Sequence, residues 1–377
     1  MKRLADICDI QYGYAFDSKC FTEDSSYPQL VRIRDVKRGY SETYYSGDYP
    51  EEYILSEGDL LIGMDGEFNI ARWKCSGALL NQRVCKLTTK VGTNEEYLRF
   101  AMLKSLKEIE QRTAFVTVKH LSVKELNKLE LDVPELTKQD KIADTLSRLE
   151  RVIEARKEEL EKLDNLIKAR FVELFGDPDN NEKSWDIDKM EHLCEVGSSK
   201  RIYQNEQSME GVPFLRISDL VNRIDTGSKK CDLYIPIEKF AELKEQGLVP
   251  RSGDILLTAR GTLGRCYIVQ SDDEFYFQDG MITWLSNYDR RITALYISYL
   301  FEMPGFRKQI DALQAGSTVA YMSISMTKKL NIMVPPIELQ NQFADFVKQV
   351  DKSKVAVQKA LEKTQLLFDS LMQQYFG

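Results

Sequence analysis

Residues 117–176, TVKHLSVKELNKLELDVPELTKQDKIADTLSRLERVIEARKEELEKLDNLIKARFVELFG, occur a second time in this chain. Moved by 201 positions without a gap, the stretch falls on residues 318–377, and 17 of the 60 positions are identical. Unrelated sequences would agree at only about one position in sixteen on average amino-acid usage. The chain therefore contains two copies of one unit, and this repeat determines the architecture that we expect.

Each copy has a front rich in short β-like runs and a long helical back. We predict strands at 29–36 (QLVRIRDV) and 59–64 (DLLIGM) in the first front, and at 214–220 (FLRISDL) and 254–258 (DILLT) in the second. Helices are predicted at 95–109 and at 294–300, the second broken by Pro304, and the spacing of Ser122 and Glu125 predicts a capping box. The predicted domains are residues 1–138, 139–178 (helix and linker), 179–337 and 338–377 (helix).

The two backs, at about 139–175 and 340–376, carry apolar residues at alternating steps of three and four, with polar steps at Arg156, Arg170, Lys354 and Thr364. A heptad stripe of this length favours a partner helix, although each helix could instead lie on its own front. We expect an α+β chain of two mixed fronts separated by an antiparallel coiled coil. Its predicted interface is Leu146, Leu149, Ile153, Leu160, Leu163, Ile167, Val347, Val350, Val357, Leu361, Phe368 and Leu371.

Composition limits the classes of partner and compartment. The net charge is −7, so any contact with nucleic acid has to come from local patches or from a partner that supplies positive charge. Seven scattered cysteines without a CxxC pair indicate reduced thiols in a cytoplasm, and neither a signal peptide nor a membrane span is expected.

The sequence contains no credible catalytic or metal site. There are only two histidines, no GxxxxGK[ST] phosphate loop, and no FxGxG loop with a [DN]PP[YF] box such as an adenine methyltransferase would carry. Pro178-Asp179 before Glu182-Lys183 only faintly resembles a nuclease motif, and a solvated linker explains it better. We therefore expect no cofactor and no metal on this chain.

Three kinds of polar, Gly-flanked loop occur in both fronts instead: 63–72 against 258–265, Gln82 against 278–280, and 117–122 against 316–323. Arg and amide side chains read base edges, whereas hydroxyls and cations suit phosphate. For any one loop, an ordinary turn or helix cap is an equally good explanation. The candidate base readers are Asp65, Glu67, Gln82, Arg260 and Gln278, and the candidate phosphate contacts are Thr117, Lys119, Ser122, Ser317, Thr318 and Ser323. The further DNA-binding candidates are Arg32, Arg34, His120, Arg216, Thr262 and Tyr321.

The order and duplication of these motifs resemble the specificity subunit of type I restriction–modification systems over essentially the whole chain. The resemblance is carried by MKRLADICDI, VRIRDV, GDLLIGMDGEF and TVKHLSVKELNKLELDVPELTKQ with their second copies LRISDL, GDILLTARGT and STVAYMSISMTKKLNIMVPPIELQNQ. It implies that each front is a target-recognition domain for double-stranded DNA and each helix a spacer. It further implies that the chain has no activity of its own, that two modification subunits methylate adenine with S-adenosylmethionine, and that restriction subunits complete the nuclease.

Two other functions remain open at this stage. A self-contained enzyme, such as a fused methyltransferase and specificity protein, would need a cofactor loop that we do not find. A two-headed coiled-coil scaffold for protein partners is compatible with the acidic charge. The second copy has Ala320-Tyr321 where the first has Lys119-His120, so the two fronts are expected to contact DNA differently.

Overall fold

The computed structural model describes residues 1–112, 121–312 and 320–377. These residues form two compact units: unit 1 comprises residues 1–158 and 358–377, and unit 2 comprises residues 159–357. Both units contain part of each long helix, α5 (Leu136–Phe175) and α12 (Ile337–Phe376). The grouping therefore does not follow chain order, because each front is joined by the beginning of one long helix and the end of the other.

Unit 1 contains a four-stranded antiparallel sheet in the order β2-β10-β7-β8, a three-stranded sheet in the order β4-β9-β6, and two short pairs, β1-β11 and β3-β5. Its strands are β1 (Lys2–Arg3), β2 (Cys8–Tyr12), β3 (Phe21–Thr22), β4 (Leu30–Val31), β5 (Tyr44–Tyr45), β6 (Ile54–Leu55), β7 (Leu60–Gly63), β8 (Asn69–Arg72), β9 (Ala78–Leu80), β10 (Val84–Thr89) and β11 (Glu130–Leu131). Its shorter helices are α1 (Leu4–Ile7), α2 (Ile33–Val36), α3 (Glu95–Arg112) and α4 (Val123–Lys128).

Unit 2 repeats this plan with sheets in the orders β13-β19-β16-β17 and β15-β14-β18 and with the pair β12-β20. Its strands are β12 (Asp186–Lys189), β13 (Glu195–Gly197), β14 (Val212–Leu215), β15 (Tyr234–Ile235), β16 (Ile255–Thr258), β17 (Cys266–Ile268), β18 (Tyr276–Phe277), β19 (Ile282–Ser286) and β20 (Asn331–Val334). Its shorter helices are α6 (Met190–Leu193), α7 (Ile217–Thr226), α8 (Ile237–Glu245), α9 (Ala294–Glu302), α10 (Pro304–Ala312) and α11 (Ile324–Lys328).

The two predicted GD-φ-L strands are confirmed as β7 and β16, and Pro304 separates α9 from α10 as expected. The prediction that each strand continues through its R-I-x-D segment is wrong. Each strand ends before its arginine, and a helix begins directly after it. The reason is that Asp35 and Asp219 accept the backbone N–H of Arg32 and Arg216, at 2.9 Å in both cases, which caps the helix start.

A buried glutamine joins each long helix to its front. Gln139 and Gln340 are both 1% exposed. Each side chain accepts the backbone N–H at the start of the front's main helix, from Asn94 or Thr293 (2.9 Å in both units), and donates to the carbonyl of Pro134 (2.8 Å) or Pro335 (2.9 Å). A buried amide with all these partners fixes the angle at which the helix leaves the front.

The two long helices are antiparallel where they meet within unit 2. Asp164 of α5 binds Lys354 of α12 (2.5 Å), and further along α5 the guanidinium of Arg170 lies over the ring of Phe346, which comes earlier in α12. The polar positions Lys354 and Arg170 within the apolar stripe therefore each contact a side chain of the opposite helix. In unit 1, likewise, Arg156 donates to Thr364 Oγ1 at 2.5 Å. All twelve predicted interface residues are buried or half-buried, but part of this burial comes from the fronts: Leu146 belongs to the core of the first front, and Ile167, Val347 and Val350 belong to that of the second.

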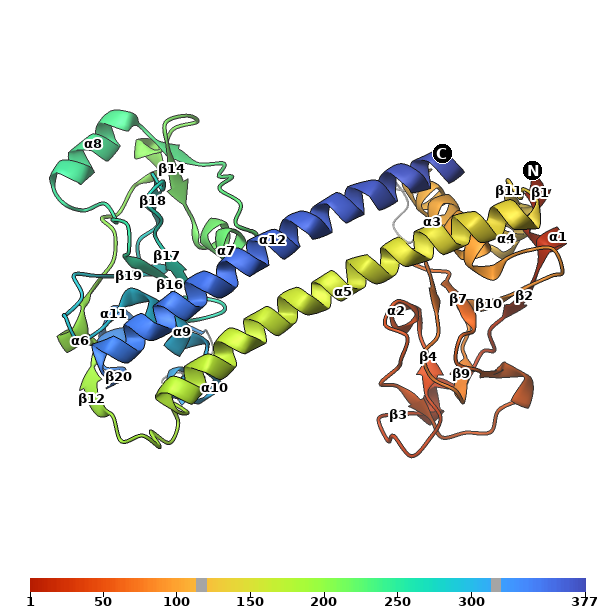
Figure 1. Cartoon of the computed structure of the whole chain (residues 1–377), viewed down its shortest axis with the longest axis horizontal. Coiled ribbons are helices and arrows are strands. Elements are labelled where there is room, and N and C mark those ends of the chain that lie inside the picture. The colour runs from red at the N-terminus through yellow and green to blue at the C-terminus, as the bar shows by residue number, and fades with distance from the viewer. Residues whose placement is uncertain (113–120, 313–319) are drawn as a thin grey trace. The chain divides into compact units, whose positions relative to one another are not determined.

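The ends of the long helices complete the cores of the fronts (Figure 1). In unit 1 the last turns of α12 pack on the core beneath α3, with Phe376 5.3 Å from Tyr97 and Phe368 6.0 Å from Phe100 between ring centroids. In unit 2 the end of α5 supplies Phe175, fully buried 4.9 Å from the ring of Tyr296. Each front thus buries aromatic side chains from a helix that begins elsewhere in the sequence.

Candidate nucleic-acid interface

In each unit, four loops converge at one end of the four-stranded sheet. We call residues 13–14, 64–68, 81–83 and 121–122 the loop cluster of unit 1. The residues 198–201, 259–265, 278–281 and 320–323 form the loop cluster of unit 2. The three kinds of loop singled out in the sequence contribute to both clusters.

Backbone hydrogen bonds hold the clusters together in the same way. In unit 1, Met64 N–H donates to the carbonyl of Arg83 (2.9 Å), and Leu121 N–H donates to the carbonyl of Met64 (2.7 Å). In unit 2, Ala259 N–H donates to Met281 (2.9 Å), and Met322 N–H donates to Ala259 (3.0 Å). In each unit, the loop after β7 or β16 is therefore hydrogen-bonded on one side to the turn before β10 or β19 and on the other to the segment before α4 or α11. These segments lie far apart in sequence.

A parallel strand pair brings a fourth element to each cluster. Val31 of β4 lies opposite Leu80 of β9, and Leu215 of β14 lies opposite Phe277 of β18. Arg32 and Arg216 follow these strands directly, so they flank the turns that begin at Asn81 and Gln278. Gln278 N–H donates to the carbonyl of Leu215 at 2.9 Å. These two arginines therefore lie beside the turns that carry the candidate base readers Gln82 and Gln278.

The turns that carry the candidate amides differ between the units. Residues 81–83 join β9 to β10, whereas residues 278–281 join β18 to β19, one residue more. In the first turn the left-handed position is taken by Arg83, with φ of 72°, and in the second by Gly280, with φ of 67°. The backbone plan is thus shared, while the groups that it presents are not.

The remaining candidates in unit 1 have the following partners. Asp65 pairs with Arg83 at 3.3 Å, and Glu67 pairs with Lys37 at 3.2 Å. Gln82 is exposed, and its backbone N–H donates to Tyr14. Arg34 is an exposed residue of α2, and Ser122 caps α4 by accepting the N–H of Glu125 at 3.2 Å, as predicted.

In unit 2, Arg260 lies over the ring of Tyr321, 5.7 Å from its centroid, and both are exposed. The carbonyl of Thr262 accepts Thr258 Oγ1 at 2.5 Å, which closes the 258–265 loop. Ser323 caps α11 through Met326 N–H at 3.1 Å. Arg216 binds Asp219 at 2.9 Å, and this hydrogen bond raises the pKa of the guanidinium.

Some candidates cannot be placed, and sequence reasoning missed others. Thr117, Lys119, His120, Ser317 and Thr318 lie outside the described residues. The missed residues are Tyr14, Arg83 and Arg201, whose side chains reach the clusters. Arg201 Nε donates to Asp279 Oδ2 at 2.8 Å, a contact across 78 positions that no local pattern reveals, and this bond raises the pKa of Arg201.

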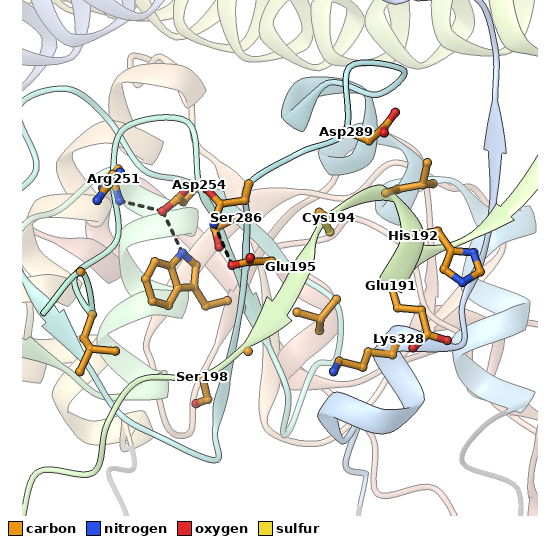
Figure 2. A pocket seen from close by; sticks show the side chains of 17 residues that line it. Glu191, His192, Cys194, Glu195, Ser198, Arg251, Asp254, Ser286, Asp289 and Lys328 are labelled. Atoms are coloured by element: carbon orange, nitrogen blue, oxygen red, sulfur yellow. Dashed lines mark hydrogen bonds between the residues drawn. The ribbon is translucent and has the colours of Figure 1, made fainter.

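Unit 2 also has a pocket of about 740 Å³ on one face of its four-stranded sheet (Figure 2). Asp254 at its wall accepts Trp284 Nε1 at 2.9 Å and the backbone N–H of Arg251 at 2.8 Å. Several carboxylates line it, namely Glu191, Glu195, Asp254 and Asp289. Arg251 and Lys328 also line the pocket, but the four carboxylates outnumber these two cations, so we do not place nucleic acid there.

The part of the chain that the structure describes contains neither a metal-ligand cluster nor a membrane-spanning helix. Within residues 1–112, 121–312 and 320–377, no group of three or more His, Cys, Asp or Glu side chains is arranged to hold a metal ion. None of the described helices is long and apolar enough to cross a membrane.

Comparison with known proteins identifies the family. The model of the type I restriction modification DNA specificity domain matches residues 1–165 and again 182–366. The chain is 28% identical over 407 residues to the type I restriction enzyme EcoBI specificity subunit of Escherichia coli, across 99% of this chain and 84% of that protein. It is 25% identical over 342 residues to a putative type I restriction enzyme specificity subunit of Haemophilus influenzae, across 87% and 83% of the two chains.

Solved structures agree on the fold. The S subunit of a type I restriction–modification system from M. genitalium superposes with a TM-score of 0.58 at 15% identity, covering 100% of this chain and 95% of that one. A chain from a study of assembly and conformational transition in the type I system gives 0.55 at 16% identity, covering 99% and 96%. The duplicated fronts, their loop clusters and both copies of the family domain lead to one conclusion. This chain belongs to the type I restriction–modification DNA-specificity family and is a specificity subunit with two DNA-recognition domains.

Proposed function

We propose that each front reads one half of a bipartite, asymmetric site in double-stranded DNA, and that α5 and α12 set the distance between the halves. The observation that carries this proposal is the pair of loop clusters, which share one backbone plan and present different side chains. Arg83 and Asp65 occupy the cluster of unit 1, whereas Arg260, Tyr321 and Gln278 occupy that of unit 2. Different groups on equivalent loops read different bases.

The chain contributes recognition and no chemistry of its own in this proposal. Two modification subunits bind S-adenosylmethionine and methylate adenine, and restriction subunits add cleavage. What supports a role as a subunit is the family itself, together with relatives that are named as specificity subunits of type I restriction enzymes. The same membership favours this function over a two-headed scaffold for unrelated proteins.

Exchange of one front tests the proposal. Residues 179–337 are replaced by those of a relative that recognises another sequence, and the chimaera is expressed with its modification subunit. Sequencing of the methylated DNA should then show one altered half-site and one unchanged half-site. The reciprocal exchange of residues 1–138 is the matched control and should alter the other half. If both halves change together in either chimaera, the fronts are not independent readers.

A further inference from the structure

Each loop cluster presents an arginine held by a less exposed aspartate from a different loop. In unit 1 the Nη1 atom of Arg83 lies 3.3 Å from Asp65, and the side chains are 52% and 21% exposed. In unit 2 Arg201 donates to Asp279 at 2.8 Å, with exposures of 64% and 22%. We propose that Arg83 and Arg201 read guanine in the first and second half-sites, with Asp65 and Asp279 as positioning residues. This inference rests on the proposed function.

The backbone of Arg83 supports a functional role. Its φ of 72° lies in the left-handed region, where Gly280 stands in the corresponding turn of unit 2. A side chain in this conformation has a conformational cost that glycine avoids. The turn therefore holds an arginine at a position where glycine would be unstrained. Strain of this kind is concentrated at functional sites, and the side chain of Arg83 is exposed to solvent.

Inheritance from a common ancestor does not by itself explain the two pairs. In unit 1 the arginine stands in the turn between the strands and the aspartate in the loop after β7. In unit 2 the aspartate stands in the turn, and the arginine belongs to the loop after β13. The arginine and the aspartate thus come from different loops in the two units, yet each unit presents an arginine bound to a less exposed aspartate at the same end of the sheet. The same group has thus been placed twice by different residues.

The chemistry of the pair suits a base edge. A guanidinium has a planar set of donors that can bind the O6 and N7 atoms of guanine with two parallel hydrogen bonds in the major groove. Asp65 and Asp279 limit the rotation of the arginine to which each is bound, so less freedom is lost when the base is bound. The same planar fork can also bind a phosphate, so the two roles differ in sequence dependence: a base contact discriminates between sequences, whereas a phosphate contact does not. The expected base reader in unit 1 is therefore Arg83, and Asp65 becomes its positioning residue.

The test uses the full chain in complex with its modification subunit. Arg83→Lys keeps the positive charge and a non-glycine residue at the left-handed position, but it loses the planar set of donors. Arg201→Lys likewise keeps the charge and loses the planar donors in unit 2. Methylation of a library of DNA sites is measured for each variant. We expect Arg83→Lys to reduce discrimination at one guanine of one half-site by about tenfold or more, and Arg201→Lys to do so in the other half.

Arg291→Lys is the matched control. Arg291 is 47% exposed, binds Asp289 at 2.8 Å and Asp188 at 3.1 Å, and lies beyond the opposite end of β19 from the cluster. This variant should leave the methylated motif unchanged. Arg83→Gly should fold with a melting temperature no lower than that of the parent, while discrimination at the same guanine is lost. Asp65→Asn should weaken that discrimination in part, with an unchanged salt dependence of DNA binding.

Three results separate the possibilities. Unchanged motifs in both lysine variants would overturn the inference and leave the proposed function intact. An equal loss on all sequences, with a smaller salt dependence in Arg83→Gln, would make these arginines phosphate contacts and would also overturn it. If the parent complex methylates no bipartite motif at all, it is the proposed function that fails.

Discussion

At the scale of single residues, the second front contains a buried ion pair. Arg223 is bound to Asp273 at 3.2 Å, and their side chains are 4% and 0% exposed. The hydroxyl of Tyr267 and the amine of Lys229 also reach Asp273, at 2.7 and 3.0 Å. Burial by itself raises the pKa of Asp273, but the backbone N–H of Gln270 and these side chains outweigh it, so the pKa lies below its usual value.

Replacing Asp273 by Asn should therefore destabilise unit 2 strongly. The change leaves the guanidinium of Arg223 buried without its anion, which costs about 3–5 kcal/mol. Urea unfolding followed by circular dichroism measures the loss. Asp272→Asn is the control, because Asp272 binds the same Lys229 at 2.9 Å but is 77% exposed, and little change is expected.

The pH dependence of the stability of the parent and of Asp273→Asn is a second test of the same ion pair. Since the pKa of Asp273 is lowered on folding, its charge stabilises the parent above the unfolded value of about 3.9, and this contribution disappears as the pH falls further. The difference between parent and Asp273→Asn should then shrink on acidification from about pH 5. A difference that stays constant in acid would show that the packing of the side chain matters more than its charge.

At the scale of elements, the long helices were foreseeable because their stripe repeats over forty residues in both copies. The helix at the first R-I-x-D segment was not, since α2 has only four residues after Arg32 and the decisive contact is one hydrogen bond from the Arg32 N–H to Asp35. The arginine–aspartate pairs between different loops could not be predicted from the sequence for another reason. Arg201 and Asp279 meet through the folded sheet, and the left-handed conformation of Arg83 leaves no mark in composition.

The length of α5 and α12 should set the spacing of the two half-sites. Seven residues added after Glu161 and after Glu362 lengthen each helix by about 10.5 Å at 1.5 Å per residue. That length corresponds to about three base pairs at 3.4 Å each. The contacts of Arg156 with Thr364 and of Asp164 with Lys354 each remain on one side of both insertions. We expect methylation to shift to sites with a longer spacer and unchanged halves.

A two-residue insertion at both positions is the control for this experiment. It rotates the following stripe by about 200° and should misalign Leu163 and Ile167 and destabilise the helix pair. Full activity of the two-residue variant, or an unchanged spacer preference of the seven-residue variant, would mean that the helices serve as a docking surface for partner subunits and do not measure distance.

At the scale of the whole molecule, charge limits what the chain does alone. A net charge of −7 leaves little attraction for the DNA backbone, which supplies most non-specific affinity. We expect the isolated chain to bind a labelled duplex weakly near 150 mM salt, with a shallow salt dependence, and to bind a cognate duplex tightly once the modification subunit is added. A scrambled duplex is the control. Tight, sequence-dependent binding by the isolated chain would contradict a need for partner cations.

The division of the long helices between the units also bears on the order in which the protein is made. Unit 2 is continuous in sequence, so its core has all its members once residue 357 has been synthesised. The front of unit 1 is translated first, yet its apolar surface beneath α3 lacks Phe368, Leu371 and Phe376 until the ribosome reaches them. Domains generally fold as units during synthesis. Here the first front to emerge is the last to be covered, and we expect the apolar surface on which the end of α12 packs to stay exposed throughout the translation of the second front.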